Sequence, residues 1–125
     1  MPEVRFRYIV NDVDAAVEFY TKMLGFKVEM HPGPGFANLS LDGAQLYLNR
    51  PGGGGGAGQS MPDGQSPTPG GWNRIQLVIE DIESLAEKMK ADGVNLRSDI
   101  INGNGGKQVV VDDPSGNPIE LFQPH

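Results

Sequence analysis

Few side chains in this sequence could do chemistry, and their types exclude several kinds of site. The chain has no cysteine, so it has no disulfide, no thiolate metal ligand and no cysteine nucleophile. Of its two histidines, His31 precedes a proline at the end of an expected strand, and His125 is the last residue. Glu120 lies in an apolar stretch, PIELF, near the end of the chain. Two arginines, Arg5 and Arg74, begin two similar segments and carry fixed positive charge.

The elements that must position these residues occur twice along the chain. RFRYIVNDVDAAVEFYTKMLGF begins at Arg5, and RIQLVIEDIESLAEKMKADGV begins at Arg74. Each segment reads as an apolar strand, an aspartate that can cap a helix, and an amphipathic helix. The capping residues are Asp12 and Asp81, and a glycine ends each helix, as glycine does after many helices.

The second part of each half repeats as well. Residues 38–50 and 109–123 both read as strand, tight Asp/Gly turn and strand, which is the pattern of a hairpin. In this alignment Tyr47 is the counterpart of Glu120. Each half is therefore predicted to be βαβββ. The expected strands are 4–10, 26–31, 36–41, 45–50, 73–79, 94–98, 107–112 and 118–122.

We expect a first module over residues 1–50 and a second over residues 72–125, packed as one compact domain. One such module cannot cover both faces of its sheet, so two modules or two chains must pair. The segment 51–71 between them is rich in Gly, Pro and Ser and has no periodicity. It reads either as a flexible linker between the repeats or as a mobile lid over a cleft. A phosphate-binding loop is not expected, since neither Lys-Ser/Thr nor a helix start follows the glycines.

Two motifs resemble the vicinal oxygen chelate superfamily, which includes glyoxalase I, extradiol dioxygenases and bleomycin-resistance proteins. They are D-x-x-x-A-x-x-F-Y-x-x-x-L-G-F, from Asp12 to Phe26, and DPSGNPIEL, from Asp113 to Leu121. The resemblance covers essentially the whole chain. It implies an α+β fold in which two tandem βαβββ modules form a cup-shaped mixed β-sheet with helices on the outer face. Because such cups are often completed across two chains, it also implies a homodimer.

In metal-using members of that superfamily, the first and last strands of each module supply the ligands of one divalent ion. The resemblance places these positions at Arg5, Tyr47, Arg74 and Glu120. Only Glu120 matches, because a guanidinium has no lone pair to give and a neutral tyrosine is a poor ligand. The usual set of two histidines and one carboxylate for iron cannot be assembled. We therefore expect no cofactor and no metal, although Glu120 remains the one candidate catalytic residue.

Two roles remain open for these charged side chains. Glu120, Arg5 and Arg74 could neutralise one another in the floor of the cup, or the arginines could bind a ligand. Strand alternation sorts the neighbouring side chains between the two faces of the sheet. The residues expected to line the cup are Arg5, Arg7, Tyr47, Asn49, Arg74, Gln76, Glu120 and Phe122, with Trp72 at the rim. Aromatic surface with a few polar groups suits an organic ligand of moderate size, although Trp72 could equally be a packing anchor between modules.

Composition narrows the choice of partner. The net charge of −6 over 125 residues disfavours nucleic acid, which demands a basic face. No segment reads as a signal peptide or a membrane span, so we expect a cytoplasmic protein with no membrane partner. The favoured hypothesis is a metal-free protein that sequesters a small, neutral or anionic aromatic molecule, such as a drug or natural product.

Two alternatives belong to other classes of protein. One is a metal-dependent lyase, isomerase or dioxygenase of the superfamily, in which Glu120 is a ligand or a general base. A metal-free enzyme with Glu120 as base and Arg74 as oxyanion stabiliser is a variant of it. The other is an interaction module whose cup is filled by its own side chains.

Overall fold

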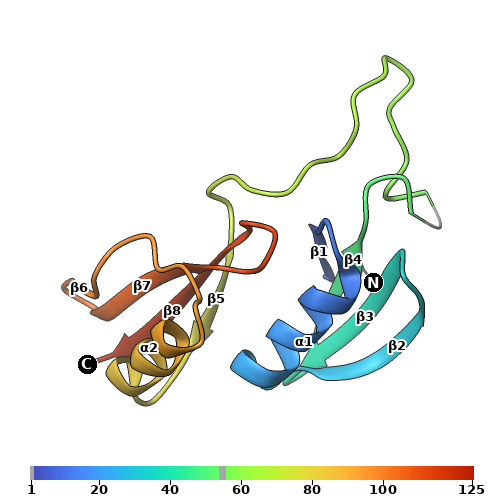
Figure 1. The fold of residues 1–125 in the computed structure, drawn as a ribbon. Helices are drawn as coiled ribbons and strands as arrows, with labels where there is room; N and C mark the ends of the chain where they lie inside the picture. Colours follow the sequence, from blue (N-terminus) through green and yellow to red (C-terminus); the bar gives the residue numbers. More distant parts are fainter. Residues whose placement is uncertain (1, 54–55) are drawn as a thin grey trace. The chain divides into compact units, whose positions relative to one another are not determined.

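The computed structural model describes residues 2–53 and 56–125. The chain forms two compact units, Met1–Pro69 and Gly70–His125, which we call the first and second modules. Each consists of one helix and a four-stranded mixed sheet, so the predicted fold, two tandem βαβββ modules, is confirmed (Figure 1).

The first module runs from β1 to β4 around one helix. Its sheet has the order β1-β4-β3-β2, with β1 parallel to β4 and the other neighbours antiparallel. The adjacent β3 and β4 form the predicted hairpin. The elements are β1 (Phe6–Ile9), α1 (Val13–Leu24), β2 (Lys27–Gly33), β3 (Phe36–Leu41) and β4 (Ala44–Asn49).

The second module has the same topology. Its sheet has the order β5-β8-β7-β6, and β5 is again parallel to the last strand of the module. The strand β6 is very short. The elements are β5 (Ile75–Val78), α2 (Ile82–Ala91), β6 (Ile101–Asn102), β7 (Gly106–Asp112) and β8 (Pro118–Pro124).

Both helices begin and end as the sequence predicts. Asp12 Oδ1 accepts from Ala15 N at 3.0 Å, and Asp81 Oδ1 accepts from Ser84 N at 3.1 Å. Gly25 and Gly93 follow the helices with φ of 78° and 82°, a left-handed conformation that favours glycine. No helix in the described part of the chain is both long and apolar enough to span a membrane.

The predicted strand over 94–98 is wrong. Leu96 forms only an isolated bridge with Val111, and the strand that pairs with β7 at this edge is β6, further along the chain. Two backbone bonds flank this bridge, from Arg97 N to Val110 O at 2.8 Å and from Asp112 N to Asn95 O at 2.9 Å. The side chains of Asn95 and Arg97 also reach β7, where both donate to the carboxylate of Asp112. The segment thus pairs with β7 at one bridge but does not continue into a strand.

Each sheet has one face covered by its helix and one face without a helix, which we call the helix-free face. The covered faces form the cores, and alternate residues of the strands are directed toward them as predicted. Phe6 is an exception, because it is 42% exposed at the start of β1. The largest fully buried side chains are Tyr20, Leu39, Leu46 and Leu48 in the first module and Ile82, Met89, Ile119 and Leu121 in the second.

Candidate functional site

Tyr47 is the centre of an aromatic and cationic cluster on the helix-free face of the first module. In the sheet it lies opposite Arg7 on β1 and Asn38 on β3. The guanidinium carbons of Arg5 and Arg7 lie 5.4 and 5.2 Å from its ring centroid. The ring of Phe36 meets it edge to face, with centroids 5.7 Å apart. Tyr47 therefore has two cations within the range of a cation–π interaction, as well as an aromatic neighbour.

A cavity of about 610 Å³ opens beside this cluster. Its lining includes Arg7, Phe36, Tyr47 and Asn49 from the sheet, and Gly56 and Ala57 from the glycine-rich segment. Cavities of this volume, with aromatic walls and few polar groups, are typical of sites for small organic molecules.

Asn49, one of the residues that line this cavity, carries a buried amide oxygen without a partner among the described residues. The residue is only 3% exposed, and its Oδ1 has no hydrogen-bond partner in the described structure. Asn38 Oδ1, on the same face, is also buried without a partner. A buried carbonyl oxygen that makes no hydrogen bond costs about 1–3 kcal/mol, so native proteins seldom leave one unpaired without a reason.

Backbone hydrogen bonds fold the beginning of the glycine-rich segment back onto the first module. Arg50 N donates to Gly35 O at 3.1 Å, and Gly53 N donates to Arg50 O at 2.8 Å. Gly52 N donates to Gly58 O at 2.6 Å, which closes a small loop beside the cavity. Residues 54 and 55 of the predicted linker or lid lie outside the described residues.

Glu120 lies on the helix-free face of the second module, where both of its oxygens are engaged. Arg74 contacts a single oxygen, Oε1, from Nε at 3.0 Å and from Nη2 at 2.8 Å, a charge-assisted contact. Gln76 Nε2 donates to Oε2 at 2.6 Å. Glu120 is 9% exposed, so this group is largely shielded from water. Arg5, in the first module, lies against Tyr47 and 3.6 Å from the carboxylate of Glu3.

The carboxylate and imidazole groups of the described residues do not form a set of ligands for a divalent cation. Among residues 2–53 and 56–125, no group of three or more histidine, aspartate or glutamate side chains is placed to hold a metal. His31 Nε2 lies 2.9 Å from Asp14 Oδ1, and His125 Nε2 lies 3.1 Å from Gly103 O, so both imidazoles have other contacts. A cation at Glu120 would have to displace Arg74 or Gln76.

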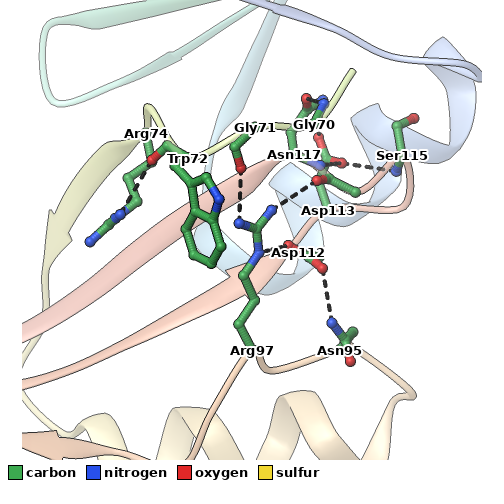
Figure 2. A network of polar contacts seen from close by, with 11 residues as sticks. Gly70, Gly71, Trp72, Arg74, Asn95, Arg97, Asp112, Asp113, Ser115 and Asn117 are labelled. Atoms are coloured by element: carbon green, nitrogen blue, oxygen red, sulfur yellow. Dashed lines mark hydrogen bonds and ion pairs between the residues drawn. The ribbon is translucent and has the colours of Figure 1, made fainter. Parts of the chain in front are cut away.

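Trp72 lies on the guanidinium of Arg97 in the second module (Figure 2). The guanidinium carbon is 4.5 Å from the centroid of the indole ring. Trp72 is nevertheless 68% exposed. A second cavity, of about 280 Å³, is lined by both residues together with Arg74 and Gln108. Within its module, the indole of Trp72 therefore contacts Arg97 and leaves most of its surface exposed.

The DPSGN stretch, one of the motifs that carry the family resemblance, has a structural role in this chain. Asp113 Oδ1 accepts from Ser115 N at 2.8 Å and from Asn117 N at 2.9 Å, which closes the turn between β7 and β8. Asn117 Oδ1 then accepts from Gly70 N at 2.8 Å. The turn therefore holds the chain just before Trp72 as well as the hairpin itself (Figure 2).

The predicted site residues form two groups, one on each module. Arg5, Arg7, Tyr47 and Asn49 are together in the first module; Trp72, Arg74, Gln76 and Glu120 lie along β5 and β8 or just before them in the second. The remaining one, Phe122 on β8, is opposite Gln108 and half-buried. Sequence reasoning missed Arg97, Asp112, Gln108 and Asn38. The polar residues within the 94–98 stretch were the only signal for Arg97, because its partner is set by tertiary packing.

The family of the chain follows from its sequence over nearly the whole length. The chain belongs to the Glyoxalase/Bleomycin resistance protein/Dioxygenase superfamily, whose model matches residues 4–121.

Several solved structures are similar over nearly their whole length. TnmS3, an antibiotic binding protein from Streptomyces sp. CB03234, is 25% identical, with a TM-score of 0.72 and coverage of 100% of this chain and 98% of that one. The fosfomycin resistance protein FosX from Listeria monocytogenes is 16% identical, with a TM-score of 0.74 and coverage of 99% and 91%. Lactoylglutathione lyase from Agrobacterium tumefaciens is 18% identical, with a TM-score of 0.72 and coverage of 98% and 94%.

Proposed function

We propose that this protein binds a small aromatic molecule, neutral or anionic, on the helix-free faces of its modules and sequesters it without a metal. The observation that carries the proposal is the cavity of about 610 Å³ beside Tyr47. Its walls combine two aromatic rings, a guanidinium and an amide, which together can stack a flat ring and orient a polar substituent.

Charge favours a neutral or anionic ligand over a cationic one. In the described structure Arg7 has no carboxylate partner, so its positive charge is not neutralised at the cavity. A carboxylate, phenolate or carbonyl on the ligand would complement that charge. A cationic ligand would be repelled, although water screens this repulsion because Arg7 is exposed.

The unpartnered Asn49 oxygen supports a bound ligand in this place. Rotation about the last side-chain bond of asparagine is a soft torsion, so the amide can present either its oxygen or its nitrogen to the cavity. A ligand with a hydrogen-bond donor would pair the orphaned oxygen and remove the cost of leaving it buried and unpaired.

The similarity to TnmS3, named an antibiotic binding protein, favours binding without chemistry. Lactoylglutathione lyase, in contrast, is an enzyme with the same fold. The arrangement around Glu120 gives the enzyme alternative less support, because a carboxylate whose two oxygens are held by Arg74 and Gln76 is poorly placed to take a proton or a metal. As in superfamily members that complete their cup across two chains, we propose a homodimer.

The test is a panel of aromatic carboxylates, phenols and their cationic analogues, followed by calorimetry and by the shift in melting temperature. We expect anionic and neutral rings to bind and Arg7→Met to weaken the anionic ones. Arg50→Met is the matched control, since Arg50 is an exposed arginine of the same module outside the cavity lining. Absence of binding across the panel would overturn the proposal, and turnover of a compound by metal-loaded protein would favour the enzyme alternative.

A further inference from the structure

Arg97 is fixed by hydrogen bonds from all three of its nitrogens. Nε donates to Asp112 Oδ1 at 2.7 Å, Nη1 to Gly71 O at 2.9 Å, and Nη2 to Gly116 O at 3.2 Å (Figure 2). A long side chain normally samples several rotamers. The three hydrogen bonds restrict the guanidinium of Arg97 to one orientation. Its plane is therefore a rigid support for whatever lies on it.

The support extends to the backbone of Trp72 as well as to its ring. Arg97 binds the carbonyl of the preceding residue, Gly71, and Arg74 Nη1 donates to the carbonyl of Trp72 at 3.2 Å. One residue further back, Gly70 N is held by Asn117 at 2.8 Å. Three side chains from different parts of the second module thus fix the backbone that carries the indole.

A large ring that is held this firmly and is still 68% exposed is not a packing anchor of its own module. A packing anchor would be buried, whereas a ring held in place and exposed has already lost the freedom that binding would otherwise have to remove. We infer that Arg97 is a positioning residue that holds Trp72 as a stacking platform for a planar, electron-rich or anionic ring. This inference rests on the proposed function and names the ligand class for the second module.

The electronic character of the ligand follows from the cation under the indole. Arg97 lies 4.5 Å from the ring centroid, within the range at which a guanidinium attracts the π electrons of tryptophan. That attraction draws electron density toward Arg97 and leaves the opposite face of the indole less negative. An electron-rich ring or a ring with a carboxylate stacks favourably on such a face, and a cationic ring does not.

The adjoining cavity can receive the rest of the same molecule. It is lined by Trp72, Arg97, Arg74 and Gln108 and has a volume of about 280 Å³. The amide of Gln108 can donate to or accept from a polar substituent. Aspartate and glutamate already pair with both arginines, so the site carries little net charge and selects mainly by flatness and by the polarised indole.

The experiment uses the whole 125-residue chain and the fluorescence of Trp72, which is its only tryptophan. The probes are naphthoate, its saturated counterpart decalin carboxylate, and naphthyl trimethylammonium. The variants are Arg97→Met, Arg97→Lys and Trp72→Leu. Lys107→Met is the control, because Lys107 forms an ion pair with Glu83 in the same module, outside the lining of this cavity.

We expect naphthoate to bind best and to quench Trp72. Arg97→Met and Trp72→Leu should weaken its binding on the order of fivefold or more, since cation–π and stacking contributions correspond to such factors. Arg97→Lys keeps the charge but loses the flat fork, so it should weaken binding as well. The Lys107→Met control should bind naphthoate with an affinity within about twofold of that of the natural protein, because the ion pair it removes is exposed.

A measurement without ligand separates positioning from binding. In Arg97→Met and Arg97→Lys the anisotropy of Trp72 should fall and its quenching by acrylamide should rise, with circular dichroism unchanged. Unchanged anisotropy and quenching in a folded variant would overturn the inference, even if no probe binds and the proposed function fails. Naphthoate binding that is equal in the natural protein and in folded Arg97→Met would overturn the inference and leave the proposed function standing. If Arg97→Met does not fold, the same measurements on Arg97→Lys test the inference: the anisotropy and acrylamide quenching of Trp72 without ligand, and the affinity for naphthoate.

Discussion

Gln76 donates from Nε2 to Oε2 of Glu120 over 2.6 Å, and this bond completes a carboxylate whose other oxygen is already held by Arg74. The three side chains come from the two parallel neighbours β5 and β8 or from the residue just before β5, and in the register Gln76 lies directly opposite Glu120. Glu120, where the family resemblance led us to expect a metal ligand, is thus part of a closed hydrogen-bonded group in this chain.

Removing the cation should be more damaging than neutralising the anion. Arg74→Met leaves a mostly buried carboxylate with one amide partner, and we expect a loss of about 2–3 kcal/mol in the free energy of unfolding. Glu120→Gln leaves a guanidinium that is 27% exposed and can still reach water, so about 1 kcal/mol is expected after allowance for solvent screening. Urea denaturation measures both. Equal losses, or a larger loss for Glu120→Gln, would contradict this account of the group.

Metal loading should leave the protein without a stoichiometric ion. The expected reason is that Arg74 and Gln76 occupy both oxygens of Glu120, while the equivalent positions Arg5 and Tyr47 are poor ligands. The measurement is elemental analysis of untagged protein after incubation with Fe(II), Zn, Mn, Ni and Co and subsequent desalting. Retention of one metal per chain that disappears in Glu120→Ala would make the enzyme alternative the primary one.

Most of the fold could be predicted because its determinants are local. Apolar alternation set the strands, and the capping aspartates Asp12 and Asp81 and the glycines after the helices set the helix ends. The repetition of these signals in two halves then required two modules of the same topology. The 94–98 strand was the error: its backbone pairs with β7 only around Leu96, and the length of such a pairing depends on tertiary packing that the local pattern does not carry.

The candidate site was predictable only in part. Alternation placed Arg7, Tyr47 and Asn49 on one face, and the cavity beside them agrees with that placement. It could not show that the Asn49 oxygen lacks a partner, because hydrogen bonding depends on the positions of all neighbouring atoms. The contact between Arg97 and Trp72 could not be predicted from the sequence either, because a turn and a hairpin register bring these distant residues together.

Asn49→Leu should separate stability from binding. Replacing an amide that has an unpaired oxygen by an apolar side chain of similar size removes a desolvation cost, so we expect the protein to be unchanged or more stable by up to about 1–2 kcal/mol. Ligands with a hydrogen-bond donor should bind less tightly, because they lose their acceptor. Urea denaturation and calorimetry with a phenol and its methyl ether measure the two effects.

Asn38→Leu is the matched control for that prediction. Asn38 Oδ1 is also buried without a partner, but the residue is not part of the cavity lining. It should therefore give a similar change in stability and no change in affinity. A marked loss of stability in Asn49→Leu would mean that its amide is paired in solution, and equal losses of affinity in both variants would argue against a role for Asn49 in ligand selection.

The loop beside the first cavity should depend on Gly53 and Gly58 but not on Gly56. A methyl group on Gly53 would lie 2.9 Å from both Arg50 O and Gly35 O, and one on Gly58 would overlap Arg50 O. These carbonyls belong to the backbone that folds the loop onto the sheet, so the backbone beside the cavity must shift to relieve the contact. Gly56 lines the same cavity, yet a methyl group there meets nothing within 4 Å.

We therefore expect Gly53→Ala and Gly58→Ala to weaken ligand binding on the order of tenfold, whereas the free energy of unfolding falls by only about 1 kcal/mol because the segment lies outside the helices and strands that form the core. Gly56→Ala adds the same methyl group without the clash and should bind the ligand nearly as the natural protein does. Calorimetry with the best aromatic ligand measures the affinity of each variant, and urea denaturation measures its free energy of unfolding. If all three variants bind alike, the loop contributes nothing to the site, and the ligand is held by the sheet residues Arg7, Tyr47 and Asn49 alone.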